Sequence, residues 1–573
     1  MFKDLKIPKK FPFPYSSEEF TKKEKSILSN FFTNVDKPVF GIYNLPQEVV
    51  GAMFSRYSRS DKSVRRLFLD EFWDSSFSTL KSNQKNLEKA NERANNFYKK
   101  VYAEYGDDSV IQVGSIHIAF EYVSQIAVQI IEDQRIGASY IEKSTRYVNF
   151  GNKINNQYLY SDVPEIYKSE FKNEFKKWNE FAFDAYNKHI ITATNYFSKK
   201  YPLESFADVK NVKDPEEVEK LKRAHLRALR AKAFDTIRTF LPTTVITNLG
   251  AHYSGQAAEN TINKLLSSQF AEARLLGKMA FEELFKISPN FLQNVNFRHG
   301  ESTRNYRNEI YNLHHKVTDK YLKELNDGDD QNEVKIVDWD KNGFLKIASQ
   351  ILYTSQVSTN FSKRQINSYV KENKDLVPEI VKNSIPDRSK PQYNRRHKLP
   401  RAFEHAYFEI EFYKDFGIYR DLRRNRISST ERLPLNPESL YVPSEYYEAG
   451  MEEVLKDYLK LDKMTKDLYK KINKSKNHEL KFASEYITLL GHKLRFNIKA
   501  NLRQWVFFAE LRTIAGGHPS YRNAMQNAVK EITKKAPELW PIFAKVDWVE
   551  DYGLGRMKAE VYTQEMLSKI KKI

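Results

Sequence analysis

Helical periodicity dominates the pattern of apolar and polar positions along the chain. In several long stretches apolar residues recur every three to four positions, which is typical of amphipathic helices. A further helical pattern follows Asp214-Pro215 and is interrupted at Leu241-Pro242. Helices are therefore expected over 45–59, 79–105, 164–201 and 215–240, with two more helical stretches from residue 453 onward.

A smaller number of segments alternate between apolar and polar residues, which is the pattern of a strand. Residues 334–339 alternate in this way and end at Asn342-Gly343, a pair typical of tight turns. With strands few and helices many, the sequence predicts an α+β fold that is rich in helix.

Changes in composition predict four successive parts of the chain. The amino-terminal residues are rich in Pro and Lys, and the chain turns polar between residues 289 and 332, in segments such as RHGESTRNYR and NDGDDQNE. Polar stretches of this kind usually mark boundaries. We expect an amino-terminal arm over 1–37, a first half over 38–288, a linker over 289–332 and a second half over 333–573.

The 573-residue chain contains no cysteine, which removes several classes of chemistry. A cysteine nucleophile, a disulfide framework, a cysteine-ligated zinc and an iron–sulfur cluster are all excluded. The formal charge of +19 fits nucleic-acid binding, attraction of small anions such as nucleotides, or a compositional bias toward Lys and Asn with no selected partner. Because no basic tail or RNA-recognition signature is present, nucleic-acid binding is not favoured.

Membrane and metal signatures are weak. No stretch approaches the roughly 20 apolar residues of a membrane span, and the amino terminus lacks the apolar segment of a signal peptide, so we expect a cytoplasmic protein with no membrane partner.

The segment DWDKNG resembles the start of a calcium loop, but Ser349 occupies the closing position, so a turn is favoured. Adjacent His314 and His315 cannot share one helix face, and no metal site is expected.

Two segments, one in each half, have the same layout. Residues 106–150 and 401–443 each pass from an alternating strand into a helix that ends in Arg, followed by a polar turn rich in Ser and Thr. Guanidinium groups, hydroxyls and free backbone amides at such a helix end match the oxygens of a phosphate. Each segment therefore predicts an anion site.

The residues of these segments resemble the signature of the flavin-dependent thymidylate synthases. That signature is R-H-R, then roughly eight residues, then S-x-R, after a segment such as F-E-H-A. In the first copy Asp133 and Gln134 replace the first two residues. That copy keeps the rest of the signature as Arg135, Glu142, Ser144 and Arg146.

The second copy retains the opposite part of the signature. It carries Phe403-Glu404-His405-Ala406 and then Arg424-Asn425-Arg426, whereas a Pro-containing stretch replaces its S-x-R. The two copies are therefore complementary at this motif.

A later family region, R-x-x-L-P followed by N-x-R, L-R and a His, is divided in the same way. The first copy supplies Arg238 to Pro242, and there Ser254, Gln256 and Lys264 replace the following motif residues. The second copy has Glu485 in place of that Arg but keeps the remaining residues, Asn501, Arg503, Arg512 and His518.

This resemblance implies two tandem copies of the family fold, an antiparallel sheet flanked by helices, with composite sites between the halves. Substrate-binding residues implied by the family are Glu142, Ser144, Arg146, Arg238 and Arg512, with Ser144, Arg146 and Arg238 at the nucleotide phosphate. Flavin-binding residues implied are Arg135, His405, Arg424, Arg426, Asn501 and Arg503. Arg424 and Arg512 are the expected catalytic cations, which stabilise charge developing on the uracil ring.

The resemblance also implies a reaction. In this family reduced FAD delivers hydride, methylenetetrahydrofolate supplies one carbon, NADPH reduces the flavin and dUMP becomes dTMP without an obligatory protein cysteine. Family enzymes are homo-oligomers, which implies a dimer of two-copy chains. Two alternatives stay open: a catalytically silent relative that binds nucleotides or nucleic acid, and a flavoenzyme that acts on another pyrimidine nucleotide.

Overall fold

The computed structural model describes residues 7–8, 11–45, 47–73, 112, 114–206, 212, 214–323, 332–557 and 559–563. The helix expected over 79–105 lies outside these residues. The chain divides into two compact units. The first unit consists of Met1–His189, Phe240–Gly328 and Lys456–Leu489, and the second of Ile190–Thr239, Asp329–Leu455 and Leu490–Ile573. Each unit thus includes a segment from the sequence copy that mainly builds the other unit.

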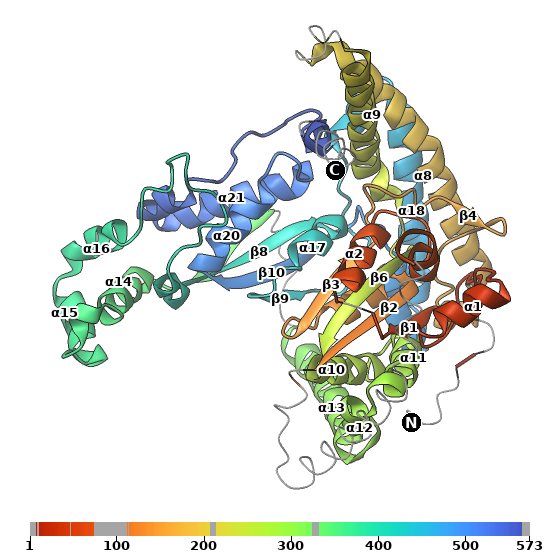
Figure 1. Cartoon of the computed structure of the whole chain (residues 1–573), viewed down its shortest axis with the longest axis horizontal. Helices are drawn as coiled ribbons and strands as arrows, with labels where there is room; N and C mark the ends of the chain where they lie inside the picture. Colours follow the sequence, from red (N-terminus) through yellow and green to blue (C-terminus); the bar gives the residue numbers. More distant parts are fainter. Residues whose placement is uncertain are drawn as a thin grey trace. The chain divides into compact units, whose positions relative to one another are not determined.

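A four-stranded antiparallel sheet forms the centre of the first unit (Figure 1). Its strands are β1 (Val39–Ile42), β2 (Ser115–Ser124), β6 (Ile246–Ser254) and β3 (Ala138–Glu142), in the order β1-β2-β6-β3. Alternate residues of β1 and β2 enter two different buried clusters, because successive side chains point to opposite faces of a strand. Helices α10 (Gly255–Leu266) and α11 (Ala271–Ile287) supply one cluster, and α2 (Gln47–Tyr57) supplies the other.

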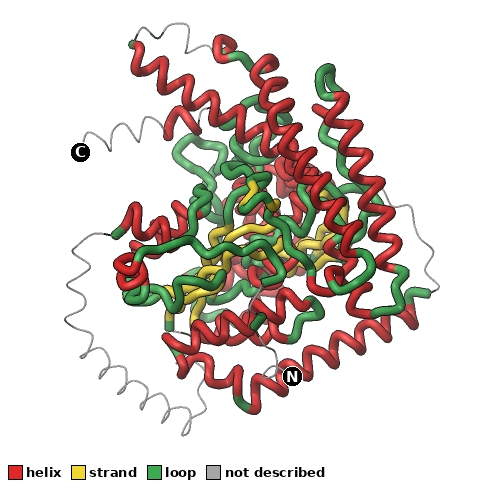
Figure 2. The backbone as a smooth tube through the Cα atoms, turned by 90° about the vertical axis from the view of Figure 1, so that its right-hand side faces the viewer, coloured by secondary structure: helices red, strands yellow, loops and turns green. Residues whose placement is uncertain are grey.

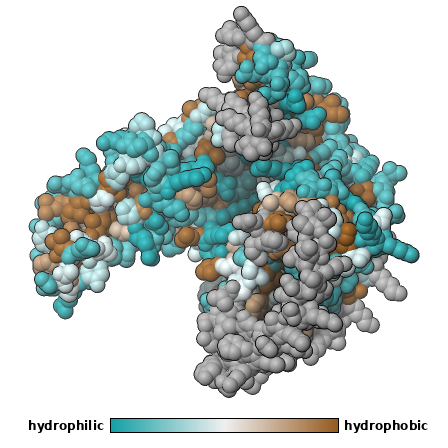
Figure 3. All heavy atoms as spheres, viewed as in Figure 1, coloured by the Kyte–Doolittle hydropathy of each residue, from teal (hydrophilic) through white to brown (hydrophobic). Residues whose placement is uncertain are grey.

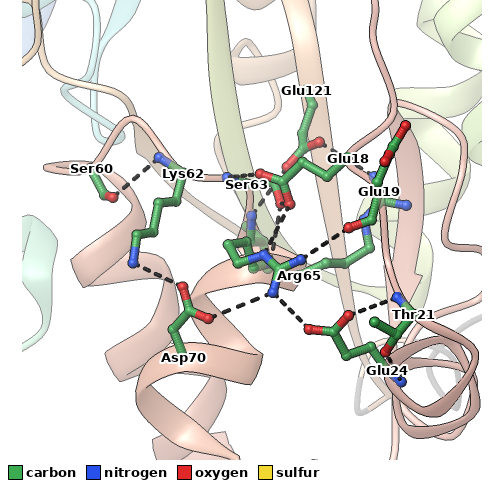
Figure 4. A network of polar contacts seen from close by, with 12 residues as sticks. Glu18, Glu19, Thr21, Glu24, Ser60, Lys62, Ser63, Arg65, Asp70 and Glu121 are labelled. Carbon is green, nitrogen blue, oxygen red and sulfur yellow. Dashed lines mark hydrogen bonds and ion pairs between the residues drawn. The ribbon is translucent and has the colours of Figure 1, made fainter.

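Further elements complete the first unit. Figure 4 shows how the segment before α3 is held: the hydroxyl of Ser63 donates to the carboxylate of Glu18 at 2.8 Å, and Thr21 and Glu24 form the capping box of α1. The remaining elements are α1 (Lys22–Leu28), α3 (Val64–Leu67), η1 (Phe68–Phe72), α6 (Gln125–Glu132), β4 (Lys153–Ile154), β5 (Gln157–Tyr158), α7 (Pro164–Tyr167), α12 (Pro289–Asn296), α13 (Arg298–Tyr321), α19 (His478–Ala483) and η9 (Ser484–Tyr486).

The second unit repeats the same sheet. Its strands are β7 (Val334–Trp339), β8 (Tyr407–Asp415), β10 (Lys493–Asn501) and β9 (Ser429–Arg432), antiparallel and in the order β7-β8-β10-β9. Strand for strand this is the order of the first sheet, with β8 in the place of β2 and β10 in the place of β6. The repeated order confirms that the chain contains two copies of one α+β fold.

Along β8 and β10 buried and half-buried residues alternate, so one face of this sheet packs on a core. Helices α20 (Leu502–Arg512) and α21 (Pro519–Lys535) follow β10, as α10 and α11 follow β6. The other elements of this unit are η3 (Leu203–Ser205), α9 (Pro215–Ile237), α14 (Gly343–Tyr353), η5 (Gln356–Ser358), α15 (Lys363–Glu372), η6 (Lys374–Leu376), α16 (Val377–Asn383), η7 (Arg401–His405), α17 (Phe416–Leu422), η8 (Ser444–Tyr447) and η10 (Pro537–Phe543).

The remaining helices, α8 (Lys172–Lys200) and α18 (Glu452–Asn473), divide their residues between the units, and η4 (Arg238–Phe240) lies at a boundary. Helix greatly exceeds strand throughout (Figure 2). Apolar side chains are exposed over α14 to α16, among them Val357 and Phe361 (Figure 3). In the described part of the chain, no helix combines the length and the apolar character needed to cross a membrane.

Candidate functional site

Three segments of the second unit meet at the amino-terminal end of α20. Asn501 caps this helix, its side-chain oxygen accepting from the backbone N–H of Gln504 at 2.9 Å. The N–H of Leu502 donates to the carbonyl of Ala406 at 2.8 Å, and the side-chain amide of Gln504 donates to Asn425. The structure therefore brings together the F-E-H-A segment, the R-N-R turn and the N-x-R helix start of the second copy.

Arg503 pairs with Glu404, the neighbour of His405 in the chain. The guanidinium of Arg503 donates to the carbonyl of Leu399 at 2.6 Å and forms an ion pair with Glu404 at 2.9 Å. His405, next to Glu404, lines a cavity of about 490 Å³ whose wall also includes Thr354, the residue directly after α14. A volume of this size is within the range of small-molecule sites.

The R-N-R turn after α17 exposes two cations and buries an amide. Arg424 and Arg426 are exposed, whereas Asn425 is buried between them. The side-chain nitrogen of Asn425 has no hydrogen-bond partner, and a buried donor without a partner is costly. A buried donor beside two exposed cations matches a ligand that carries both carbonyl and anionic oxygens. Asn425 stands at the position where the resembled signature carries His.

A second cavity, of about 370 Å³, lies in the second unit and has walls from both sequence copies. The first copy contributes residues of α9, and the second contributes the residue before α17 and the start of α21. Polar residues of its wall include Lys232, Asp235, Asp415, Tyr441, His518 and Ser520. Sequence reasoning singled out His518 as a motif residue but none of the other five.

Arg238 directly follows α9 and is buried, with an exposed fraction of 3%. Its Nη1 lies 3.4 Å from a carboxylate oxygen of Asp421, and its Nη2 has no hydrogen-bond partner in the described structure. The guanidinium lies against Gly417, where a Cβ would be 3.2 Å from Nη2 and 2.9 Å from Oδ1 of Asp415. Residue 417 must therefore be glycine for Arg238 to occupy this position without displacement.

Asp415 also lies close to this glycine. Its Oδ1 accepts from the N–H of Ile418 at 3.1 Å and so caps α17, whereas Oδ2 is buried without a hydrogen-bond partner. Burial raises the pKa of Asp415 to about 6, although the positive charge of Arg238 acts in the opposite direction. The sequence gives no sign of this, because an Asp before a helix is an ordinary capping residue.

Arg512 lies at the end of α20 and is half-buried. Its guanidinium is 5.5 Å from the ring centre of Tyr521 and 5.9 Å from that of Phe508. Its Nε is buried without a hydrogen-bond partner. The cation is held by aromatic rings, an arrangement that leaves guanidinium N–H groups for a ligand.

In the first unit the S-x-R segment forms a compact turn. The N–H of Ser144 donates to the carbonyl of Ser58 at 3.0 Å, and the hydroxyl of Ser144 accepts from the N–H of Arg146 at 3.3 Å. Glu142 is buried at the end of β3 and accepts from the side chain of Gln125 at 3.2 Å.

The predicted phosphate-binding and flavin-binding residues do not all belong to one unit. Arg135 is exposed after α6 in the first unit. Arg238 belongs to the second unit, whereas Ser144 and Arg146 belong to the first. Joint binding of one phosphate by these three residues stays a prediction.

Within the described residues, no three potential metal-ligating side chains gather at one place. The acidic side chains of the DWDKNG segment have protein partners: Asp338 accepts from the hydroxyl of Tyr407 at 2.7 Å, and Asp340 pairs with Lys346 at 2.5 Å. Asp340 also accepts from the N–H of Gly343 through its backbone carbonyl, which closes the turn from β7 into α14. The segment is thus a strand-to-helix turn.

Comparison with known proteins agrees with the motifs. A family model described as thymidylate synthase complementing protein matches the chain twice, over residues 57–290 and 337–538. UPF0159 proteins of Chlamydia pneumoniae and Chlamydia muridarum are 34% and 33% identical to the chain, each over 95% of it and 98% of the relative. A UPF0159 protein of Thermoplasma acidophilum is 28% identical over 89% of the chain and 97% of its own length. The chain therefore belongs to the thymidylate synthase complementing protein family, that of the flavin-dependent thymidylate synthases, as a two-copy member.

Proposed function

We propose that this protein is a flavin-dependent thymidylate synthase-like enzyme that converts dUMP to dTMP. Methylenetetrahydrofolate would donate the carbon and NADPH would reduce the bound FAD. The observation that carries the proposal is the gathering of the second copy's motif residues, His405, Asn425, Asn501 and Arg503, around the start of α20. The absence of cysteine is compatible with this route and excludes the one that uses a cysteine nucleophile.

FAD, when bound, supplies the hydride. The protein's residues would bind and orient the cofactor and the substrate and stabilise charge that develops during the reaction. Asn425 would donate its unpartnered N–H to a flavin carbonyl, and Arg503, fixed by Glu404, would present its remaining N–H groups to the cofactor. Arg424 and Arg426 would add positive charge near the flavin, and Arg135 is the flavin-binding residue that the family motif implies in the first copy.

Nucleotide binding would rest on the first copy's residues and on Arg512. Ser144 and Arg146 offer a hydroxyl and a guanidinium in one short turn, which suits a phosphate. Arg512 would act on the pyrimidine, where its charge stabilises the anion that develops on the ring. A dimer of two-copy chains in the cytoplasm would be the working form, and nucleic acid would not be a partner.

Two variants of matched chemistry test the proposal. Purified protein is expected to carry FAD, to change its flavin spectrum with dUMP, and to form dTMP when the folate and NADPH are supplied. Arg503→Ala should weaken flavin binding and spare dUMP, while Arg146→Ala should do the reverse. Arg230 is exposed on α9 and lies outside the motifs, so Arg230→Ala serves as a surface control.

The outcomes separate the alternatives. Absence of flavin together with strong, salt-dependent binding to DNA or RNA would refute the proposal in favour of a silent nucleic-acid-binding relative. Flavin binding with no response to dUMP, but a response to another pyrimidine nucleotide, would indicate a different substrate. If neither Arg→Ala variant changed either ligand, the assignment of sites would be wrong.

A further inference from the structure

The repeated fold gives several residues of one unit an equivalent in the other. Ser124 caps α6 after β2, and Asp415 caps α17 after β8. Glu272 and Ser520 are the second residues of α11 and α21, and each of these helices is the second one after the equivalent strands β6 and β10. The two caps therefore correspond to each other, and so do Glu272 and Ser520.

Two more pairs follow from the same strands. Ser161 and Tyr441 correspond, because each follows a residue that forms an isolated bridge with the position directly before β6 or β10. Arg238 and Glu485 correspond, because they lie equally far before β6 and β10. The two units can thus be compared side chain by side chain.

In the first unit the position of Glu272 is closed by the protein itself. The carboxylate of Glu272 accepts from the N–H and the hydroxyl of Ser124 at 2.9 and 2.7 Å, and from the hydroxyls of Ser161 and Tyr486 at 3.3 and 2.8 Å. Glu272 is 1% exposed, and Ser124 and Ser161 are fully buried. A ligand could enter here only by displacing a carboxylate that four hydrogen bonds hold in place.

These bonds join parts of the chain that are far apart in sequence. Tyr486 belongs to Lys456–Leu489, the segment that the first unit receives from the second copy, whereas the other three residues belong to the first copy. Removing one partner from a buried, hydrogen-bonded carboxylate leaves an uncompensated polar group, which is costly. Glu272 therefore fastens the received segment to α6 and α11.

In the second unit the equivalent position is open. Ser520 stands where the first unit has Glu272, and its hydroxyl donates to that of Tyr441 at 2.8 Å. Ser520, Tyr441 and Asp415 all line the cavity of about 370 Å³. The shorter side chain leaves space where the first unit has a carboxylate, so a ligand can enter the second unit here.

The neighbouring charge also differs between the units. In the second unit the guanidinium of Arg238 is buried against Gly417. In the first unit half-buried Glu485 takes the place of the arginine, and Ile126, which is 1% exposed, takes the place of the glycine. The first unit thus carries a negative group where the second carries a positive one, which disfavours an anion such as a nucleotide.

We infer that only the second unit keeps this position open to a ligand, whereas the first unit uses it to fasten the segment received from the second copy through Glu272. Each chain should then bind one nucleotide, although it contains two copies of the fold. The inference rests on the proposed function for the identity of the ligand. It goes beyond that function in the number of sites and in the structural role of Glu272.

The absence of cysteine allows a direct test of the closed and open positions, because an introduced thiol is the chain's only one. Ser520→Cys places the thiol in the wall of the cavity, and Ser161→Cys places it beside Glu272. We expect N-ethylmaleimide to label the folded Ser520→Cys protein at least about tenfold faster than Ser161→Cys, which should be labelled quickly only in urea.

Two controls make the labelling rates specific. Rates compared over a range of pH correct for a difference in thiol pKa, and near-ultraviolet circular dichroism checks that both variants are folded. Equal labelling rates in the folded proteins would overturn the inference.

Urea unfolding tests the fastening role. Glu272→Ser puts the second unit's residue into the first unit and should lower the urea midpoint, whereas Ser520→Ala should change it little. Tyr486→Phe should also lower the midpoint, and the double variant with Glu272→Ser should lose less than the sum of the two, because both changes remove the same hydrogen bond. Additive losses would show that Glu272 does not hold this segment.

Calorimetric titration of the full-length, flavin-loaded protein with dUMP counts the sites. One dUMP per chain is expected. If dTMP forms but two dUMP bind per chain, the inference fails and the proposed function stands. If no dUMP binds, the proposed function fails, and the labelling rates together with the urea midpoints still decide whether the first unit's position is closed.

Discussion

Replacing Asp415 by Asn should stabilise the protein at neutral pH, because the native structure buries an ionised carboxyl that lacks one hydrogen bond. The folded pKa of Asp415 is about 6, against its ordinary value of 3.8. A difference of about two pH units corresponds to about 3 kcal/mol. Because the folded pKa is the higher one, this cost is present above pH 6, falls as the pH is lowered, and is absent below about pH 4.

Asn removes the charge and keeps the helix cap, since Asn and Asp are equally good capping residues and the bond to Ile418 survives. We therefore expect Asp415→Asn to raise the free energy of unfolding by up to about 3 kcal/mol at pH 7 and to have no effect at pH 4. Urea unfolding followed by tryptophan fluorescence measures this, because Trp339, Trp505, Trp540 and Trp548 all belong to the second unit.

Asp457→Asn is the matched control, with the opposite sign. Burial acts to raise the pKa of Asp457, but hydrogen bonds from Lys188 and His189 outweigh it and lower that pKa. This substitution should therefore destabilise the protein at neutral pH, and its effect should fade in acid. If Asp415→Asn were destabilising at pH 7, or changed stability equally at pH 4 and pH 7, the reasoning about a buried charge would be refuted.

Three further predictions use other features. Gly417→Ala should displace the guanidinium of Arg238 and lower stability by about 1–3 kcal/mol in urea unfolding, whereas Gly51→Ala, with nothing within 4 Å, should stabilise α2. Arg388→Met should lower the free energy of unfolding by about 3–5 kcal/mol, because the fully buried carboxylate of Glu510 loses its two hydrogen bonds from Arg388, at 2.6 and 2.7 Å. The double variant Arg388→Met/Glu510→Met should recover stability in the same urea unfolding measurement. No recovery would contradict this account. Iodoacetamide should leave dTMP formation unchanged, since the chain has no cysteine; inhibition would point to a contaminating cysteine-dependent enzyme.

Local pattern predicted several of the longer elements that the structure contains. The strand expected over 334–339 is β7, and the helices expected over 45–59 and 164–201 correspond to α2 and to α7 with α8. The two-copy fold was predicted from the division of motif residues, and the equal strand orders confirm it. Periodicity and motif spacing report on neighbours in sequence, which is why they succeed here.

The sequence did not predict which segments each unit takes from the other copy, nor that Asp415 lies near Arg238. Residues 190–239 belong to the first copy in sequence and to the second unit in space, and no local pattern encodes that choice. Asp415 looks like any helix cap until Arg238, about 180 residues away, is placed beside it. Glu272 and Ser520 are the second residues of α11 and α21, the helices that follow equivalent strands. Only the structure shows that Glu272 is hydrogen-bonded inside the first unit, whereas Ser520 lines a cavity in the second.

The interleaved composition of the two units also governs how the protein can be made. The first unit's opening segment is complete at residue 189, but its last segment ends at residue 489, 300 residues later. At a synthesis rate of roughly 5–20 residues per second, the opening segment waits roughly 15–60 seconds for its final partner. Neither copy can therefore fold to its finished state when expressed alone, and a ribosome-bound chain must carry an incomplete core for most of its synthesis.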